Sequence, residues 1–158
     1  MRVIGRAGST LRGVELRIIN PAEWIPRVRD LLAENWAETG FDFPFAPDVA
    51  AYQRLWDAGM VFAVGAFDGD MVAGYCTVTV TPHPHNMAVV VAANDALFVR
   101  PQYRNGLTAG RLILAAEREA SRRGAGRFTW HCRAGTPLAG MLERRGYTPV
   151  DQVVMKEI

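Results

Sequence analysis

Residues 103–112 (YRNGLTAGRL) concentrate glycine and alanine where the hydrophobic pattern changes from strand to helix. Amide groups at a helix N-terminus have no partner within the helix and carry a partial positive charge, so such a corner can bind a phosphate. Small residues let an anion approach the backbone closely, because a Cβ atom would hold the phosphate oxygens away. The stretch contains neither G-x-x-x-x-G-K-[ST] nor G-x-G-x-x-G, so it predicts either a plain turn or an anion site of another type.

A single carboxylate, Asp95, interrupts the apolar segment MAVVVAANDALFV at residues 87–99. The segment is too long and too apolar for an edge strand, and it predicts a central strand with a bulge or bend near Ala93 and Asn94. A carboxylate among apolar neighbours is costly unless it is paired or lies at an opening. Asp95 is therefore a candidate general base, and the alternative is that it only forms hydrogen bonds within the bulge.

The elements that position these two features alternate in the order β-α-α-β-β-β-α-β-α-β, which predicts an α/β (α+β) fold with a mixed sheet and about four helices. Strands are expected at 14–19, 61–67, 72–80, 87–99 and 127–132, with one or two more at 147–158. Helices are expected at 24–39, 49–58, 108–123 and 136–146, the last with Thr136 as N-cap. Without repeats or linkers, we expect one domain over 14–158 after a flexible tail at 1–13.

The composition places the chain among soluble globular domains, with 158 residues, 49% hydrophobic and 22% charged. No run approaches the roughly 18 apolar residues of a membrane span, and the N-terminus lacks the apolar core of a secretory signal. Cys76 and Cys132 make no disulfide framework, and no metal-ligand spacing occurs, so we expect a cytoplasmic protein without a metal. A net charge of +2 is too small to indicate nucleic-acid binding.

Residues 96–120 (ALFVRPQYRNGLTAGRLILAAEREA) resemble the acyl-CoA-binding motif of the GNAT superfamily of N-acetyltransferases. In that family a strand ending in L-x-V-x-P-x-Y-R leads into a loop R-x-x-G-x-G/A and a helix. Arg104 and Ala109 match the ends of this loop, whereas Leu107 stands at the middle glycine position and Gly106 lies one place earlier. The resulting form is similar to the R-x-G-x-x-G/A loop of phage-encoded members, and the resemblance extends from about residue 14 to the end.

The resemblance implies an acetyl-CoA site, with the loop amides around the pyrophosphate and the end of the strand paired with the pantetheine arm. Leu97 and Val99 would form that pairing, as well as being buried strand residues. For Arg104 and Arg111 the alternative is a solvated charge at the start of a helix. The residues assigned to acetyl-CoA in this way are Leu97, Phe98, Val99, Arg104, Asn105, Gly106, Leu107, Thr108, Ala109, Gly110 and Arg111.

Catalytic roles also follow from the resemblance. Asp95 lies where family members carry a glutamate, four residues before the final valine of the strand, and the Val99 N–H would donate to the thioester oxygen. The family often has a tyrosine acid five residues before a closing Gly-Phe phenylalanine. With Tyr147 at the phenylalanine position, that place holds Leu142, which cannot donate a proton, so we expect solvent to protonate the CoA thiolate.

The acceptor would be a primary amine on a small molecule, a protein N-terminus or a lysine. Phe43 of the loop FDFPFAPD, His85 and His131 are candidate acceptor-binding residues, although at least two of the loop's three phenylalanines are expected in the core. Two functions stay open: an acetyl-CoA-dependent N-acetyltransferase that works by direct attack in a ternary complex, and a protein that keeps this fold as a CoA-binding or partner-binding module. A homodimer is also left open.

Overall fold

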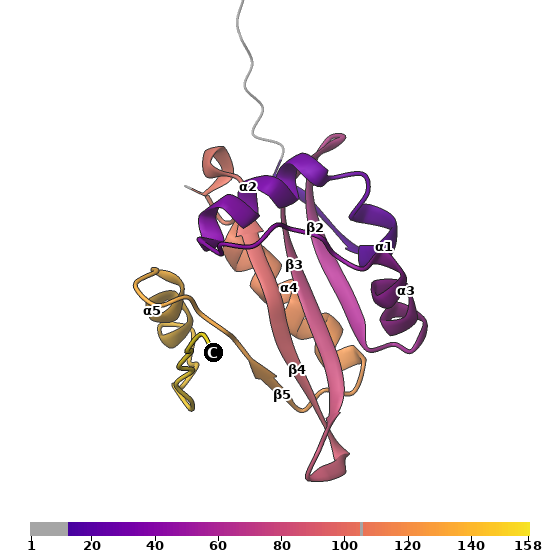
Figure 1. Ribbon diagram of the computed structural model, residues 1–158, viewed down its shortest axis with the longest axis vertical. Coiled ribbons are helices and arrows are strands. Elements are labelled where there is room, and N and C mark those ends of the chain that lie inside the picture. Colours follow the sequence, from indigo (N-terminus) through magenta and orange to yellow (C-terminus); the bar gives the residue numbers. More distant parts are fainter. Residues whose placement is uncertain (1–12, 105) are drawn as a thin grey trace, which may run out of the picture.

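The computed structural model describes residues 13–104 and 106–158, and these form a mixed five-stranded sheet with helices on both faces (Figure 1). The strands follow the order β1-β2-β3-β4-β5, with every pair antiparallel except β4 and β5. They are β1 (Glu15–Ile19), β2 (Val61–Asp68), β3 (Met71–His83), β4 (Asn86–Val99) and β5 (Arg127–Thr129). The helices are α1 (Pro21–Trp24), α2 (Arg29–Thr39), α3 (Val49–Asp57), the 3-10 turn η1 (Pro101–Tyr103), α4 (Thr108–Arg122) and α5 (Leu138–Glu143). The predicted mixed α/β fold is confirmed.

The first predicted helix is divided in two. Asn20 caps α1 by accepting a hydrogen bond from the Ala22 N–H at 3.0 Å, and Pro21 occupies the first helical position. Pro26 has no N–H and falls in the turn that follows, so the chain starts a second helix, α2, only at residue 29. This helix ends where predicted, at Gly40, whose φ of 68° is the left-handed C-cap conformation.

The long β3–β4 hairpin carries the predicted bulge, one residue beyond the expected place. The register passes from Val78 opposite Asn94 to Thr77 opposite Ala96, so Asp95 has no partner on β3. An extra residue in one strand bends that strand and redirects its side chain. The bulge therefore decides where the Asp95 carboxylate points.

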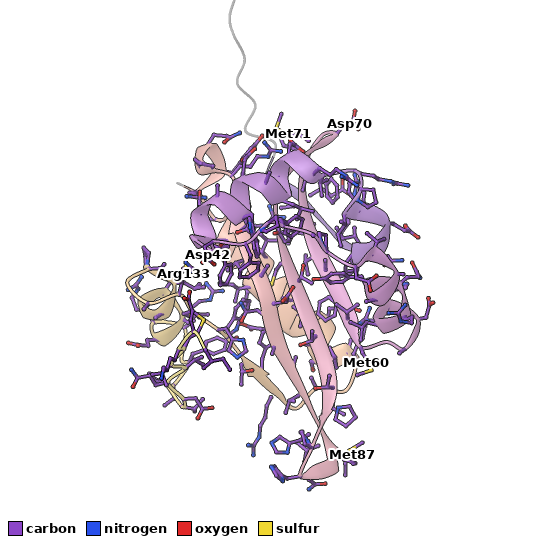
Figure 2. The ribbon with its side chains drawn as sticks, in the orientation of Figure 1. Asp42, Met60, Asp70, Met71, Met87 and Arg133 are labelled. Carbon is purple, nitrogen blue, oxygen red and sulfur yellow. The ribbon has the colours of Figure 1, made fainter. Side chains whose placement is uncertain are left out.

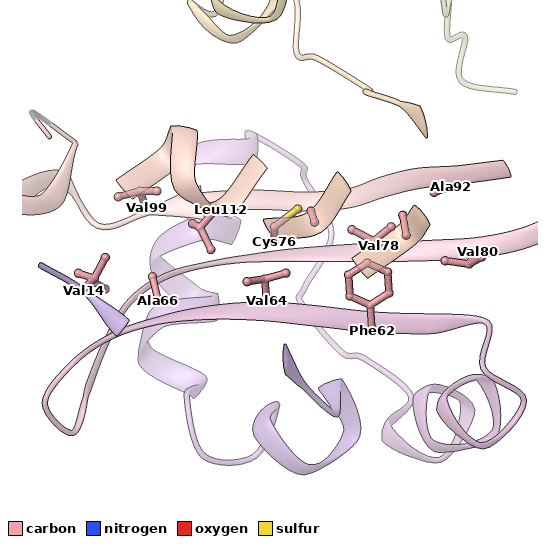
Figure 3. Close-up of a cluster of buried hydrophobic side chains, with 13 residues drawn as sticks. Val14, Phe62, Val64, Ala66, Cys76, Val78, Val80, Ala92, Val99 and Leu112 are labelled. Carbon is pink, nitrogen blue, oxygen red and sulfur yellow. The ribbon is translucent and has the colours of Figure 1, made fainter. Parts of the chain in front are cut away.

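Two apolar cores lie on opposite faces of the sheet, because successive strand residues point to opposite sides. On one face, α4 packs Leu112 and Ala116 against strand residues such as Val64 and Cys76 (Figure 3). On the other face, the side chains buried with α2 are Leu31, Leu32, Phe67, Val72, Tyr75 and Phe98. Figure 1 shows α2 in front of the sheet and α4 behind it.

The C-terminal region differs most from expectation. The strand predicted at 127–132 ends at Thr129, and the strands predicted at 147–158 are absent from this described segment, whose residues from Thr148 onward are exposed. A three-residue β5 offers a further strand too short an edge to pair with. Thr136 is not the N-cap of α5 either, because its Oγ1 donates to the Arg133 carbonyl at 2.8 Å and Pro137 holds the cap position.

Among the helices of residues 13–104 and 106–158, none has the length and apolar character needed to cross a membrane. Both cysteines are free; Cys76 is buried and Cys132 is half-buried. The tail expected at 1–13 lies outside the described residues except for Gly13.

Candidate active site

Within residues 13–104 and 106–158, no strand pairs with the outer edge of β4 next to Asp95. Parallel pairing with β5 covers only Val91–Ala93, and the chain beyond β5 runs away from β4 toward α5 (Figure 1). The Arg100 N–H donates to the Ala73 carbonyl of β3 at 2.8 Å. Because backbone groups alternate in direction along a strand, Leu97 and Val99 turn their N–H and C=O groups toward the open edge.

The separation of the two strands begins at Asn94. Its side chain donates to the His131 carbonyl at 3.3 Å and accepts from the His131 N–H at 2.5 Å. One residue before Asp95, the Asn94 side chain therefore makes the two hydrogen bonds to His131 that a strand backbone would otherwise make. This explains why β5 ends early, and it holds His131 near the bulge.

The start of α4 presents backbone amides without a side-chain cap. Its first intrahelical bond runs from the Arg111 N–H to the Leu107 carbonyl at 2.9 Å, so the preceding amides have no acceptor within the helix. A Cβ on Gly106 would meet no atom within 4 Å. The space beside Gly106, just before these amides, is therefore open, and Asn105 lies outside the described residues.

Arg104 faces away from this helix start. Its Nη2 pairs with Glu38 of α2 at 2.6 Å, its Nε donates to the Val99 carbonyl at 2.7 Å, and its guanidinium lies 5.3 Å from the Phe98 ring centroid. Its backbone N–H is also used, donating to the Pro101 carbonyl at 3.2 Å. The side chain of Arg104 thereby links α2 to the end of β4, and the Val99 N–H is left at the open edge.

Two other arginines border the start of α4. Arg111 is exposed and forms no ion pair within the described parts of the chain. Arg145, which follows α5, places its Nη2 3.5 Å from the Gly110 carbonyl. Nothing in the sequence pattern distinguishes Arg145 from other surface arginines, because only the packing of α5 brings it to this position.

The Asp95 carboxylate is exposed rather than buried between apolar neighbours, since the bulge turns it out of the sheet. Its Oδ2 accepts a hydrogen bond from the Tyr52 hydroxyl of α3 at 3.2 Å. Burial, together with the nearby Asp95 charge, raises the pKa of Tyr52 to about 12. Tyr52 therefore stays protonated at neutral pH and remains a donor to the carboxylate.

A second tyrosine lies beside this pair. The Tyr75 hydroxyl accepts a hydrogen bond from Asn35 Nδ2 of α2 at 2.6 Å. Burial is the main cause that raises the pKa of Tyr75, and the Asp95 charge adds to it. Nothing in the sequence pattern indicated that Asn35, Tyr52 and Tyr75 would gather around Asp95.

Of the two histidines predicted to bind the acceptor, one lies near Asp95 and the other lies far from it. His131 lies by the bulge through its bonds to Asn94. His85 lies at the tip of the β3–β4 hairpin, about ten residues or roughly 30 Å along the strand from Asp95, near Met87 at the far end of the molecule (Figure 2). His85 is therefore not brought together with the other candidates.

The three phenylalanines of the α2–α3 loop are not in the core. Phe41, Phe43 and Phe45 are 42%, 54% and 40% exposed, so the expectation that at least two would be buried is wrong. They gather around Trp36 of α2, which is only half-buried itself. A short loop between two helices has too little reach to bring all three rings beneath the sheet.

The side chains of Leu142 and Tyr147 both pack against other residues of the protein. Leu142, at the expected acid position, is 3% exposed. The Tyr147 hydroxyl donates to Glu117 of α4, and its ring lies edge-on to Trp130 with centroids 6.4 Å apart. Burial and this bond to Glu117 raise the pKa of Tyr147, which makes its hydroxyl a poor acid.

The buried cysteine of β3 is not placed for nucleophilic chemistry. Burial raises the pKa of Cys76, whose side chain is completely enclosed, so its thiol is not a ready nucleophile. Among residues 13–104 and 106–158, no group of three or more His, Cys, Asp or Glu side chains could hold a metal ion.

Several solved structures share this fold. A TM-score of 0.71 relates the chain to the aminoglycoside acetyltransferase meta-AAC0020 from an uncultured soil metagenomic sample, at 16% identity over 92% of this chain and 95% of that one. The ribosomal-protein-alanine N-acetyltransferase of Brucella melitensis has a TM-score of 0.66 at 16% identity, over 92% of this chain and 98% of that one. AAC(6')-Iy, solved with a bisubstrate analogue that contains CoA, has a TM-score of 0.70 at 16% identity, over 92% of this chain and 97% of that one.

No curated protein sequence matches the chain significantly. The model of the acetyltransferase (GNAT) family matches residues 25–147, which include α2, the open edge of β4, the start of α4 and Tyr147. This match covers most of the chain and agrees with the shared fold. The chain therefore belongs to the acetyltransferase (GNAT) family and is an acetyl-CoA-dependent N-acetyltransferase.

Proposed function

We propose that the open edge of β4 and the start of α4 together bind the acetyl-CoA that this N-acetyltransferase uses. The observation that carries the proposal is the edge itself: the backbone groups of Leu97 and Val99 point away from β3 where β5 no longer pairs. An extended ligand can hydrogen-bond such an edge as an added strand. The pantetheine arm, with its two amides, has the chemistry for this pairing.

The residues at the start of α4 fit a pyrophosphate. Uncapped amides from Leu107 to Gly110 and the positive end of the helix dipole favour an anion. The open space at Gly106 lets phosphate oxygens approach, and the exposed side chain of Arg111 adds a positive charge. The side chain of Arg104 takes no part, because Glu38 and the Val99 carbonyl already occupy it.

Acetyl-CoA supplies a thioester whose carbonyl carbon is open to attack by an amine. We assign to the Val99 N–H the hydrogen bond that stabilises negative charge on the thioester oxygen, because this amide points to the open edge. We assign to Asp95 the removal of a proton from the attacking amine. Tyr52 donates to Asp95 Oδ2 and so leaves Oδ1 to accept that proton.

The departing thiolate needs no side-chain acid. A thiol has a pKa of about 8.5, so its thiolate is a tolerable leaving group near neutral pH and can take a proton from water. Leu142 has no donor, and Tyr147 is engaged with Glu117. Solvent protonation is therefore the step we propose.

The acceptor is a primary amine in this proposal, and the reaction takes place in the cytoplasm, where the free Cys76 and Cys132 would stay reduced. A single domain over 14–158 carries both substrates, in keeping with the family match to 25–147. The solved relatives named above act on aminoglycosides or on a ribosomal-protein alanine, so their substrates share only the amino group.

Thiol release from acetyl-CoA in the presence of a panel of primary amines tests the function directly. We expect amine-dependent release together with calorimetric binding of acetyl-CoA. Binding without any amine-dependent release would favour a CoA-binding module instead. Absence of both in a folded protein would overturn the proposal.

A further inference from the structure

The α2–α3 loop and the end of α2 form an exposed aromatic cluster, defined here as Trp36, Phe41, Phe43 and Phe45. The centroids of the three phenylalanine rings lie 5.0, 5.3 and 5.3 Å from the Trp36 centroid. All three phenylalanines are at least 40% exposed. Aromatic side chains that gather at a surface mark a binding site more often than scattered apolar residues do.

The aromatic cluster is preformed. Trp36 Nε1 donates to the Phe43 carbonyl at 2.9 Å, which ties the loop back to α2. The Thr39 Oγ1 donates to the Trp36 carbonyl at 2.7 Å and accepts from the Phe41 N–H at 3.3 Å. A ligand that binds there would not have to order the loop, so little affinity is lost to conformational entropy.

The aromatic cluster is continuous with the Asp95 site along two routes. Asn35, the residue before Trp36, donates to the Tyr75 hydroxyl beside Asp95. On the other side, His131 is held by Asn94, and Arg133, two residues further, lies over the Phe41 ring at 5.0 Å. Two residues span about 7 Å of chain, so the cluster lies on the order of 10 Å from Asp95.

Charge limits what the aromatic cluster can hold. The Arg133 guanidinium already covers the Phe41 ring, and it forms no ion pair within residues 13–104 and 106–158. The carboxylates of α2 closest in sequence to Trp36, those of Glu34 and Glu38, are already paired with arginines. A second positive charge on the ligand would therefore find the acidic side chains of α2 already engaged, and it would compete with Arg133 for the ring face.

We infer that the acceptor is a primary amine with one positive charge and an aromatic or branched apolar body. The body rests on the aromatic cluster, and the amine reaches Asp95 past Tyr75. This inference rests on the proposed function, since it deepens the description of the same site. Polycationic acceptors are disfavoured, although such amines also carry primary amino groups.

Three primary amines test this inference: 2-phenylethylamine has an aromatic body, ethanolamine is small and polar, and spermidine is polycationic. We expect kcat/KM for 2-phenylethylamine to exceed that for each of the others at least tenfold, equivalent to about 1.4 kcal/mol. Phe43→Ser should remove most of this preference, and the loss should appear in KM rather than in kcat. Met87→Ser is the matched control, because Met87 is 69% exposed at the distant hairpin tip.

Calorimetric titration of the same amines into the CoA-bound protein provides a second readout that does not depend on turnover. Equal kcat/KM and equal affinity for the three amines would overturn the inference while leaving the proposed function standing. A preference for spermidine would overturn it as well. If Phe43→Ser instead changes the oligomeric state in size-exclusion chromatography with light scattering, the aromatic cluster is an interface between copies and the inference is wrong. Failure of acetyl-CoA itself to bind would count against the proposed function instead.

Discussion

The two sides of the site are built from different chemical groups. On the proposed acetyl-CoA side, the groups available to a ligand are backbone groups at the β4 edge and amides at the start of α4. On the acceptor side, they are side chains that come from separate elements: Asp95 from β4, Tyr52 from α3, Asn35 from α2 and Tyr75 from β3. A side chain can be removed without changing the fold, whereas a backbone group can only be obstructed. The two sides should therefore respond to mutation in different ways.

The largest effect is expected for Asp95→Asn. It removes the base but keeps an oxygen for the Tyr52 hydroxyl, so kcat should fall by about 10²–10⁴ while acetyl-CoA affinity stays within a few-fold. Steady-state kinetics and calorimetry measure the two quantities. Asp70→Asn, in the exposed β2–β3 turn, is the control (Figure 2). Near-normal turnover in a folded Asp95→Asn protein would reduce Asp95 to a structural role.

On the backbone side, Gly106→Glu should weaken acetyl-CoA binding at least tenfold, or about 1.4 kcal/mol. The substitution puts bulk and negative charge beside the proposed pyrophosphate position. Gly106→Ala is the matched control: its Cβ meets no protein atom within 4 Å, so the fold is kept, and since it adds little bulk and no charge it should weaken binding less than Gly106→Glu does. Calorimetric titration of both variants separates these effects. Unchanged affinity in Gly106→Glu would remove the pyrophosphate from the start of α4.

A smaller effect is expected for Tyr52→Phe, which removes the hydrogen bond to Asp95. Loss of a hydrogen bond to a charged group is worth about 1.5–3 kcal/mol at most, and Asp95 is exposed to water, so we expect kcat to fall by about three- to tenfold. The change should disappear in an Asp95→Asn background, because Tyr52 acts only through Asp95. Additive effects in the double mutant would show that Tyr52 has a separate role.

The smallest effect is expected for Tyr147→Phe. Its hydroxyl is bound to Glu117 on α4, and only this one hydrogen bond is lost. We expect kcat to fall by less than about tenfold, or 1.4 kcal/mol, with part of the loss appearing as lower thermal stability. A hundredfold fall with unchanged acetyl-CoA affinity would identify Tyr147 as the acid for the thiolate and exclude protonation by solvent.

Sequence patterning predicted most of the elements that form the proposed acetyl-CoA side. Hydrophobic periodicity and glycine positions located β2, β3 and α3, the end of α2 at Gly40 and the bulge to within one residue. The glycine-bearing stretch before Thr108 predicted the helix start that now borders open space. These features depend on local backbone preferences and on neighbours in sequence, which a single chain reveals directly.

Only the tertiary structure decided the acceptor side. The contact between Tyr52 and Asp95 joins residues 43 positions apart, and that between Asn35 and Tyr75 joins residues 40 apart. The exposure of Phe43 and the short β5 likewise depend on how far neighbouring elements reach. Apolar spacing indicates that a side chain is near a core, but the direction of a hydroxyl or a carboxylate is set by the partners that packing brings to it.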